Sequence, residues 1–241
     1  MSLSNSDLQR RQLLLAALLG APAYAAAQTM PPYATDGLNL FQGTSPQKAP
    51  LNPAMRFVPY REIKPIARFS HTVVEIMQWS CPYCREINDG ALDWASTLPP
   101  SFRYIQIPVM QGKRDARAAA LFAGMQITAG HRLPAFENAM FGAVQDAHAD
   151  PDDPRTIMGA AAAANLNPKP FVQAMQHDGV AQTVQEWAQL LNAARPTQTP
   201  TFCIGGQYVT DVGRTAGDYQ KLFDLVGGLV SKIISQDQAH G

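Results

Sequence analysis

Apolar residues along the chain first follow a pattern that predicts a strand, a helix and a second strand. Residues 71–79 form a mostly apolar, β-branched run of the kind found in buried strands. Residues 102–109 predict the next strand. Between them, a helix is expected to begin at Pro82 and to end before Pro99-Pro100, because proline fits the first helical turn and interrupts later ones.

The apolar spacing becomes helical over residues 113–194. Apolar residues recur there every three or four positions, which predicts roughly four or five helices. An Asp-Pro pair at 153–154 and an Asn-Pro pair at 167–168 are typical helix starts. The sequence shows no repeat with a period of about 20–50 residues, which excludes a solenoid.

Two short strands are predicted after this helical block, over residues 201–204 and 207–210. Gly205-Gly206 lies between them, which favours a hairpin. The segment from Thr215 to about residue 234 then predicts an amphipathic helix. The whole order predicts an α/β fold with a central mixed sheet and an inserted, all-helical subdomain.

The first 27 residues have the layout of a cleavable export signal. Arg10-Arg11 precede about ten apolar residues and a run of small residues that ends at Ala27. The apolar run falls short of the ~20 residues that span a bilayer, although an amphipathic or anchoring helix is the alternative. We therefore expect export to an oxidising compartment, the periplasm, by the general or the twin-arginine route.

Proline and small polar residues dominate the segment that follows, residues 28–65. We expect an extended leader there, with a wrapped arm and a strand near residues 56–63 as the alternative. The predicted boundaries are an export signal at 1–27, a Pro-rich leader at 28–65, the first part of the core domain at 66–112, the helical insertion at 113–194 and the second part of the core domain at 195–241.

Composition narrows the classes of function. Of the 241 residues, 46% are hydrophobic, which is enough for a domain with a substantial core. Lys plus Arg and Asp plus Glu each total 19, so no net positive charge attracts nucleic acid, and no nucleic-acid partner is expected. Because the sequence shows no oligomerisation segment, we expect a monomer.

Cys81 and Cys84 are separated by Pro82 and Tyr83 at the predicted start of a helix. Two cysteines at this spacing can form a disulfide with little distortion, and the helix N-terminus favours the thiolate of the first. The spacing alone also suits half of a zinc site or chance. A zinc site needs four ligands, however, and the sequence offers neither a second such pair nor paired histidines, so no metal is expected.

Thr199-Pro200 directly precedes the strand predicted at 201–204. If this peptide bond is cis, the proline can stand beside the cysteine pair, and an extended substrate chain can pair with the Thr199 backbone. The dipeptide alone is weak evidence, since only about 5% of X–Pro bonds are cis. Its position after a strand, a Cys-x-x-Cys and a helix makes it strong.

These segments together resemble the thioredoxin fold in its DsbA-like form. The resemblance rests on WSCPYC after VVEIM, on the helical insertion and on TPTFCIGGQYV before a final helix, and it covers about residues 56–235. It implies a thiol:disulfide oxidoreductase in which Cys81 is the nucleophile, Cys84 its resolving partner and Pro200 the cis-proline. The Cys81–Cys84 disulfide then takes the place of a separate cofactor.

The resemblance also implies roles for residues around the pair. Glu75 matches a buried acid that handles the proton of the inner cysteine, although a surface carboxylate at a strand edge is the alternative. Thr199, Pro82 and Tyr83 are expected to contact the substrate. Cys203 is expected to be a buried, inert thiol, with a regulatory or resolving role as the alternative.

The direction of electron flow depends on Tyr83. Strongly oxidising members of the family carry histidine there, whereas tyrosine offers no positive charge to the thiolate, so a milder oxidant is expected. The substrates would be exported cysteine-containing proteins, and reoxidation would need a membrane redox partner. The motif also resembles the DsbG-like branch, so a disulfide isomerase or reductase and a redox-linked chaperone are the alternatives.

Overall fold

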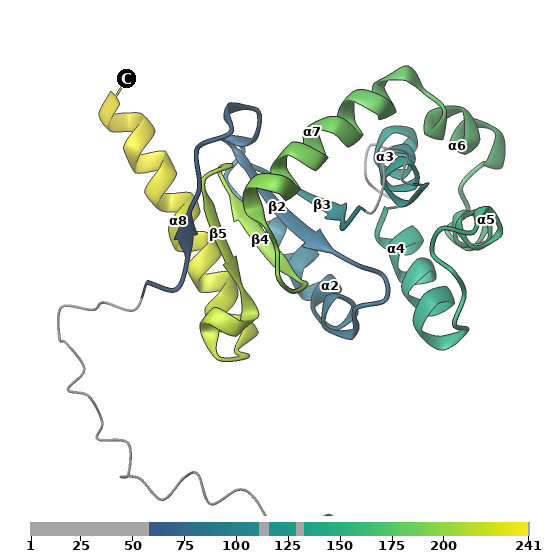
Figure 1. The fold of residues 1–241 in the computed structure, drawn as a ribbon, viewed down its shortest axis with the longest axis horizontal. Helices are drawn as coiled ribbons and strands as arrows, with labels where there is room; N and C mark the ends of the chain where they lie inside the picture. The colour runs from purple at the N-terminus through teal and green to yellow at the C-terminus, as the bar shows by residue number, and fades with distance from the viewer. Residues whose placement is uncertain (1–57, 111–115, 129–132, 241) are drawn as a thin grey trace, which may run out of the picture. The chain divides into compact units, whose positions relative to one another are not determined.

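The computed structural model describes residues 58–110, 116–128 and 133–240 (Figure 1). The predicted export signal and most of the predicted leader lie outside these ranges, so the signal, its cleavage and the export route stay predictions. No helix in the described ranges is both long and apolar enough to span a membrane.

A five-stranded mixed sheet has the strand order β1-β5-β4-β2-β3. β2 is parallel to β3, while the other neighbouring strands are antiparallel. All six residues of β2 are buried, as expected of a central strand. The predicted strands and the hairpin are confirmed. The strands are β1 (Arg61–Glu62), β2 (Thr72–Met77), β3 (Arg103–Pro108), β4 (Thr201–Ile204) and β5 (Tyr208–Asp211).

Helices cover both faces of this sheet, because successive strand residues point to opposite sides. On one face, Val73 and Phe202 pack with apolar residues of α2 (Pro82–Ala95) and α8 (Tyr219–His240). On the other face, Val74 and Cys203 pack with α7 (Asp178–Ala194) and with other helices from the segment that connects β3 to β4 along the chain (Figure 1). The predicted α/β architecture with a central mixed sheet and inserted helices is confirmed.

Within the described ranges, five α-helices follow β3 and precede β4 along the chain, which confirms the predicted helical block. The side chains of Asp153 and Asn167 accept hydrogen bonds from the backbone two residues later and so cap two of these helices. The domain boundaries themselves stay predictions. The remaining elements are η1 (Ala67–Phe69), α3 (Ala116–Thr128), α4 (Leu133–Phe141), the π-helical turn η2 (Gly142–Asp146), α5 (Pro154–Ala163), α6 (Pro168–Met175) and η3 (Val212–Thr215).

Three elements differ in extent from the prediction. α2 ends at Ala95, and the hydroxyls of Ser96 and Thr97 donate to the carbonyl oxygens of its last turn. α8 begins at Tyr219 rather than Thr215, because the short turn η3 precedes it. Within the predicted leader, Arg61–Glu62 form β1 and pair with β5, so the alternative of a strand in this segment is right.

Candidate active site

Cys81 and Cys84 lie at the N-terminus of α2. Cys81 is the N-cap residue, and its Sγ accepts a hydrogen bond from the backbone N–H of Cys84 at 3.4 Å. The side chain of Cys81 is 9% exposed and that of Cys84 is 1% exposed, and both are free thiols. The helix start therefore produces an outer and an inner cysteine.

The two thiols have opposite acid–base properties. A hydrogen bond from the Cys84 thiol lowers the pKa of Cys81 to about 5, with help from the Thr199 side chain and backbone N–H groups and against the effect of burial. The same hydrogen bond, together with burial, raises the pKa of Cys84 far above its usual value. At neutral pH the outer cysteine is thus a thiolate and the inner cysteine a thiol.

The loop between α7 and β4 brings Thr199 and Pro200 to this pair. The Thr199–Pro200 peptide bond is cis. In its thiol form, Cys81 donates to the carbonyl oxygen of Thr199 at 3.2 Å, and Pro200 is buried beside this contact. The peptide bond is thus cis, as Pro200 requires in order to stand beside the cysteine pair.

An open pocket of about 180 Å³ adjoins the same loop. The pocket therefore lies next to the backbone with which the sequence predicts an extended substrate chain to pair. The pocket is lined by Gln78, Val109, Pro196, Thr197, Gln198 and Thr199.

Glu75 is fully buried on β2, so the alternative of a surface carboxylate is wrong. Its Oε2 accepts hydrogen bonds from the Tyr104 hydroxyl and, at 3.1 Å, from Nε2 of Gln106. Burial raises the pKa of Glu75 to about 7, although these two donors oppose the shift. Its charge in turn contributes to the raised pKa of Cys84, which couples the acid to the inner thiol.

Other polar residues of this buried cluster were missed from the sequence. Gln106, opposite Glu75 in the parallel ladder, also donates to Asn88 of α2 at 3.0 Å. Glu137 of α4 is fully buried, and neither of its carboxyl oxygens has a hydrogen-bond partner in the described structure. Burial and the nearby Glu75 raise the pKa of Glu137 well above its usual value. The sequence signal that could have identified Gln106 and Glu137 was a single polar residue within the apolar pattern of a strand and of a helix.

Gln145, from the π-helical turn η2, was also missed. Its Nε2 donates to the carbonyl oxygens of Trp79 at 2.8 Å and Cys81 at 3.1 Å. Beside it, Asp146 pairs with both terminal nitrogens of Arg85 on α2, at 2.7 and 2.8 Å. The insertion thus holds the backbone of the Cys-x-x-Cys segment, and π-helical turns often occur at functional sites.

The remaining predicted residues fall into two environments. Pro82 and Tyr83 are exposed beside Cys81, Tyr83 at 57%, so both are accessible to a substrate, and their role stays a prediction. Cys203 is fully buried on β4, and burial raises its pKa to about 12, which favours the expected inert thiol. The described residues contain no group of three or more His, Cys, Asp and Glu side chains that could hold a metal ion.

Comparison with known proteins places this geometry in a family. The thioredoxin family model matches residues 68–224, which is more than half of the chain. The chain belongs to the thioredoxin family. The thiol:disulfide interchange proteins DsbA of Bordetella pertussis and Bordetella bronchiseptica are 25% and 26% identical to it over 158 residues, or 66% of this chain and 74% of each relative. The protein is therefore a DsbA-like thiol:disulfide oxidoreductase, as its residues suggested.

Solved structures of this thioredoxin-family type share the fold. DsbA of Pseudomonas aeruginosa superposes with a TM-score of 0.64 at 20% identity, covering 75% of this chain and 94% of the other. The oxidoreductase DsbA of Xylella fastidiosa gives 0.59 at 23% identity, with 73% and 96% covered. At these identities the likeness supports the thioredoxin-like fold alone.

Proposed function

We propose that the protein oxidises cysteine pairs of exported proteins in the periplasm, with the Cys81–Cys84 disulfide as its redox centre and no other cofactor. The observation that carries this proposal is the pairing of a low-pKa outer thiol with a buried high-pKa inner thiol beside a cis-proline. A stabilised Cys81 thiolate favours the reduced form of the pair, and a disulfide whose reduced form is stabilised is an oxidant.

The reaction begins with a substrate thiolate that attacks Sγ of Cys81 in the disulfide form. The Cys81–Cys84 bond breaks, its electron pair goes to Cys84, and a mixed disulfide forms between substrate and Cys81. A second substrate thiolate then attacks the substrate sulfur of that bond, and Cys81 leaves as a thiolate. The substrate dithiol loses two electrons to become a disulfide, and the protein's pair gains them.

Glu75 supplies the proton that Cys84 takes up during this reaction. Because the pKa of Cys84 is high, its departing sulfur takes up a proton, whereas Cys81 leaves unprotonated. A carboxyl group with a pKa of about 7 is protonated in part of the molecules at neutral pH, so it can give this proton and take it back on reoxidation.

Substrate binding is proposed at the loop of Thr199 and at the exposed face of Pro82 and Tyr83. An extended cysteine-containing segment would pair with the Thr199 backbone and project a side chain into the adjoining pocket. Unfolded exported proteins fit this mode, because their chains are extended. Reoxidation is assigned to a membrane redox partner, and the protein is proposed to act as a monomer without nucleic acid.

The redox state of the pair in cells tests the direction of electron flow. Cells would be quenched in acid, and free thiols labelled with a mass tag, in a Cys203→Ala background that removes the third thiol. A mostly oxidised pair is expected for an oxidase. A mostly reduced pair would overturn that assignment in favour of a disulfide isomerase or reductase. Tyr83 in place of a histidine supports this second candidate, because it predicts a milder oxidant.

Cysteine variants separate catalysis from chaperone action. Cys84→Ser cannot form the Cys81–Cys84 disulfide, but its Cys81 thiolate can attack disulfides of exported proteins. The resulting mixed disulfides are expected to accumulate, because no inner thiol remains to reverse this step by displacing the substrate from Cys81. Cys81→Ser is expected to abolish both dithiol oxidation and these adducts. If both cysteine variants kept full activity toward exported proteins, the redox mechanism would be wrong and a binding function would remain.

A further inference from the structure

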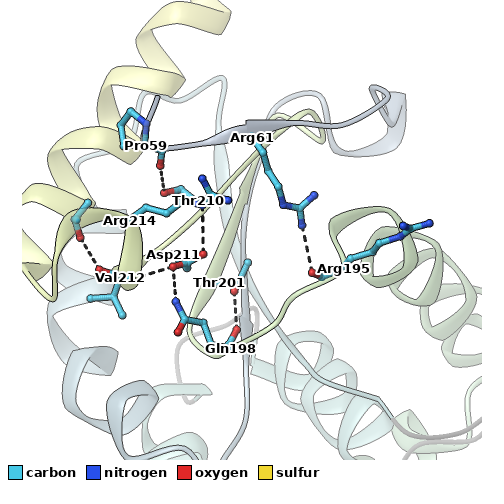
Figure 2. Close-up of polar contacts among 11 residues, drawn as sticks. Pro59, Arg61, Arg195, Gln198, Thr201, Thr210, Asp211, Val212 and Arg214 are labelled. Carbon is cyan, nitrogen blue, oxygen red and sulfur yellow. Dashed lines mark hydrogen bonds and ion pairs between the residues drawn. The ribbon is translucent and has the colours of Figure 1, made fainter. Parts of the chain in front are cut away.

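The loop that carries Thr199 and Pro200 is tied to the sheet by side-chain hydrogen bonds (Figure 2). The hydroxyl of Thr201 donates to the carbonyl oxygen of Gln198 at 2.6 Å. The side-chain amide of Gln198 donates to Oδ1 of Asp211, at the end of β5. The residue before Thr199 is therefore held through its backbone and its side chain at once.

Asp211 is itself held in place. Its Oδ1 also accepts the backbone N–H of Gly213 at 3.0 Å, and its Oδ2 lies 3.6 Å from Nε of Arg214. The turn that follows β5 therefore fixes the carboxylate, and the carboxylate fixes Gln198. This chain of contacts runs from the sheet to the residue next to Thr199 without passing through either cysteine.

The other end of the loop is tied to β1. Arg195 is the C-cap residue of α7 and has a left-handed backbone with φ of 40°. Nη2 of Arg61 donates to its carbonyl oxygen at 3.4 Å. Thr210 of β5 donates to the carbonyl oxygen of Pro59 at 2.8 Å, next to the β1–β5 pairing (Figure 2). Residues 59–61 precede the family match, which begins at residue 68.

We propose that Asp211 and Gln198 are positioning residues of the active site, which hold Thr199 against Cys81 and keep its backbone in place for the substrate. The inference rests on the proposed function and extends it to residues outside the Cys-x-x-Cys segment. Thr199 contacts the nucleophile through its carbonyl oxygen, 3.2 Å from Sγ, and its side chain stabilises the thiolate. A loop freed at Gln198 moves both groups away from Cys81 and disorders the segment that receives substrate.

Three substitutions break the same chain of contacts at different points. Asp211→Ala removes the acceptor, and Gln198→Ala removes the donor. Gly213→Ala leaves both groups but places a Cβ atom 2.8 Å from Nε2 of Gln198, which forces the amide to shift. Asp211→Asn is the conservative variant, because it keeps an oxygen for Gln198 and Gly213 and changes only the atom that faces Arg214.

A fifth variant controls for the loss of a carboxylate. Asp224 lies on the exposed side of α8, where its Oδ1 accepts a hydrogen bond from Gln220 at 3.0 Å. Asp224→Ala therefore removes one negative charge and one hydrogen bond from a glutamine amide, which Asp211→Ala also removes, but Asp224 makes no contact with the loop.

The readouts are the pKa of Cys81, from the pH dependence of thiolate absorbance in the reduced protein, and KM and kcat with a synthetic peptide dithiol. Asp211→Ala, Gln198→Ala and Gly213→Ala should each raise the pKa of Cys81 by about half a unit to one unit, as expected for a weakened hydrogen bond. They should raise KM about three- to tenfold with a smaller change in kcat. Asp211→Asn and Asp224→Ala should stay close to wild type.

The double variant Gln198→Ala/Asp211→Ala should show no more change than either single variant, because both act through one contact. The proposal is overturned if the three variants lose thermal stability while the pKa of Cys81 and KM stay at wild-type values. Additive effects in the double variant would overturn it as well. The thiolate titration needs no substrate or cell, so it gives its answer even if the proposed periplasmic oxidase function is wrong.

Discussion

At the residue scale, the function of the pair rests on how one thiol stabilises the other. The largest influence that lowers the pKa of Cys81 to about 5 is the hydrogen bond from the Cys84 thiol, ahead of the contributions from Thr199 and the helix N-terminus. Cys84 in turn stays protonated because it donates this hydrogen bond and is buried. The pKa of each cysteine therefore depends on the other cysteine.

Cys84→Ala should raise the pKa of Cys81, because the substitution removes its strongest hydrogen-bond donor. The rate of alkylation by iodoacetamide measures the thiolate fraction as pH is varied. In the wild type half of the maximal rate is expected near pH 5, and in the variant at a clearly higher pH. An unchanged midpoint would show that the backbone N–H groups and Thr199 determine the pKa without Cys84.

Glu75→Gln should stabilise the protein while slowing its reaction. Since the folded pKa of Glu75 is about 7 and the unfolded value about 4.5, the unfolded state ionises first as pH rises. The wild type therefore loses stability between pH 4.5 and 7 and carries a deficit of about 3 kcal/mol above pH 7.

Denaturant unfolding at pH 4 and pH 8 measures this effect. Glu75→Gln should exceed the wild type by up to about 3 kcal/mol at pH 8 and by little at pH 4, where both states of the wild type are protonated. Glu62→Gln, on the exposed part of β1, is the control and should show no such difference. A gain of the same size at both pH values would point to packing as its cause.

At the element scale, the helical insertion contacts the active-site segment through the π-helical turn η2. Gln145→Ala removes the donors that bind the carbonyl oxygens of Trp79 and Cys81, and should cost about 1–3 kcal/mol of unfolding free energy. Hydrogen exchange at the backbone amides of the first turn of α2 should also become faster. Gln145→Glu keeps the size and removes the amide donors, so it should behave like Gln145→Ala; wild-type behaviour would contradict the role of these hydrogen bonds.

Local patterns predicted most elements because each local cue agreed with the tertiary structure. The apolar run of β2 forms a buried strand between β4 and β3. Pro82, Asp153 and Asn167 begin or cap helices as their residue types predict. The turn η2 has no comparable cue, because the contacts of Gln145 with the Cys-x-x-Cys backbone join residues more than 60 positions apart. The limit of prediction was thus set by sequence separation.

The same limit applies to the candidate site. Cys81, Cys84 and Pro200 were marked by short motifs, whereas Gln106 and Glu137 acquire their importance only from what surrounds them. A polar residue within an apolar pattern occurs often on partly exposed strands and helices. Only the fold shows that both side chains are buried beside Glu75.

At the scale of the whole molecule, the edge of the sheet next to Asp211 is covered by a segment outside the family match. β1 covers the edge of β5, the strand whose end carries Asp211, and it is fixed there by aromatic contacts. The rings of Tyr60 and Tyr208 meet edge to face with centroids 5.4 Å apart, and Nζ of Lys232 lies 5.3 and 4.5 Å from their centroids. This cluster joins the N-terminal strand, the hairpin and α8.

Tyr60→Ala should therefore loosen β1 and destabilise the molecule by about 1–3 kcal/mol, through loss of the aromatic pair and one cation–π contact. Because β1 is the strand at this edge of the sheet, its release should also expose unpaired backbone groups of β5. Faster hydrogen exchange at residues 208–211, together with the loss in unfolding free energy, is the expected result. Tyr60→Phe keeps the ring and should retain most of the stability, so equal losses in both variants would assign the effect to the hydroxyl group that contacts Lys232.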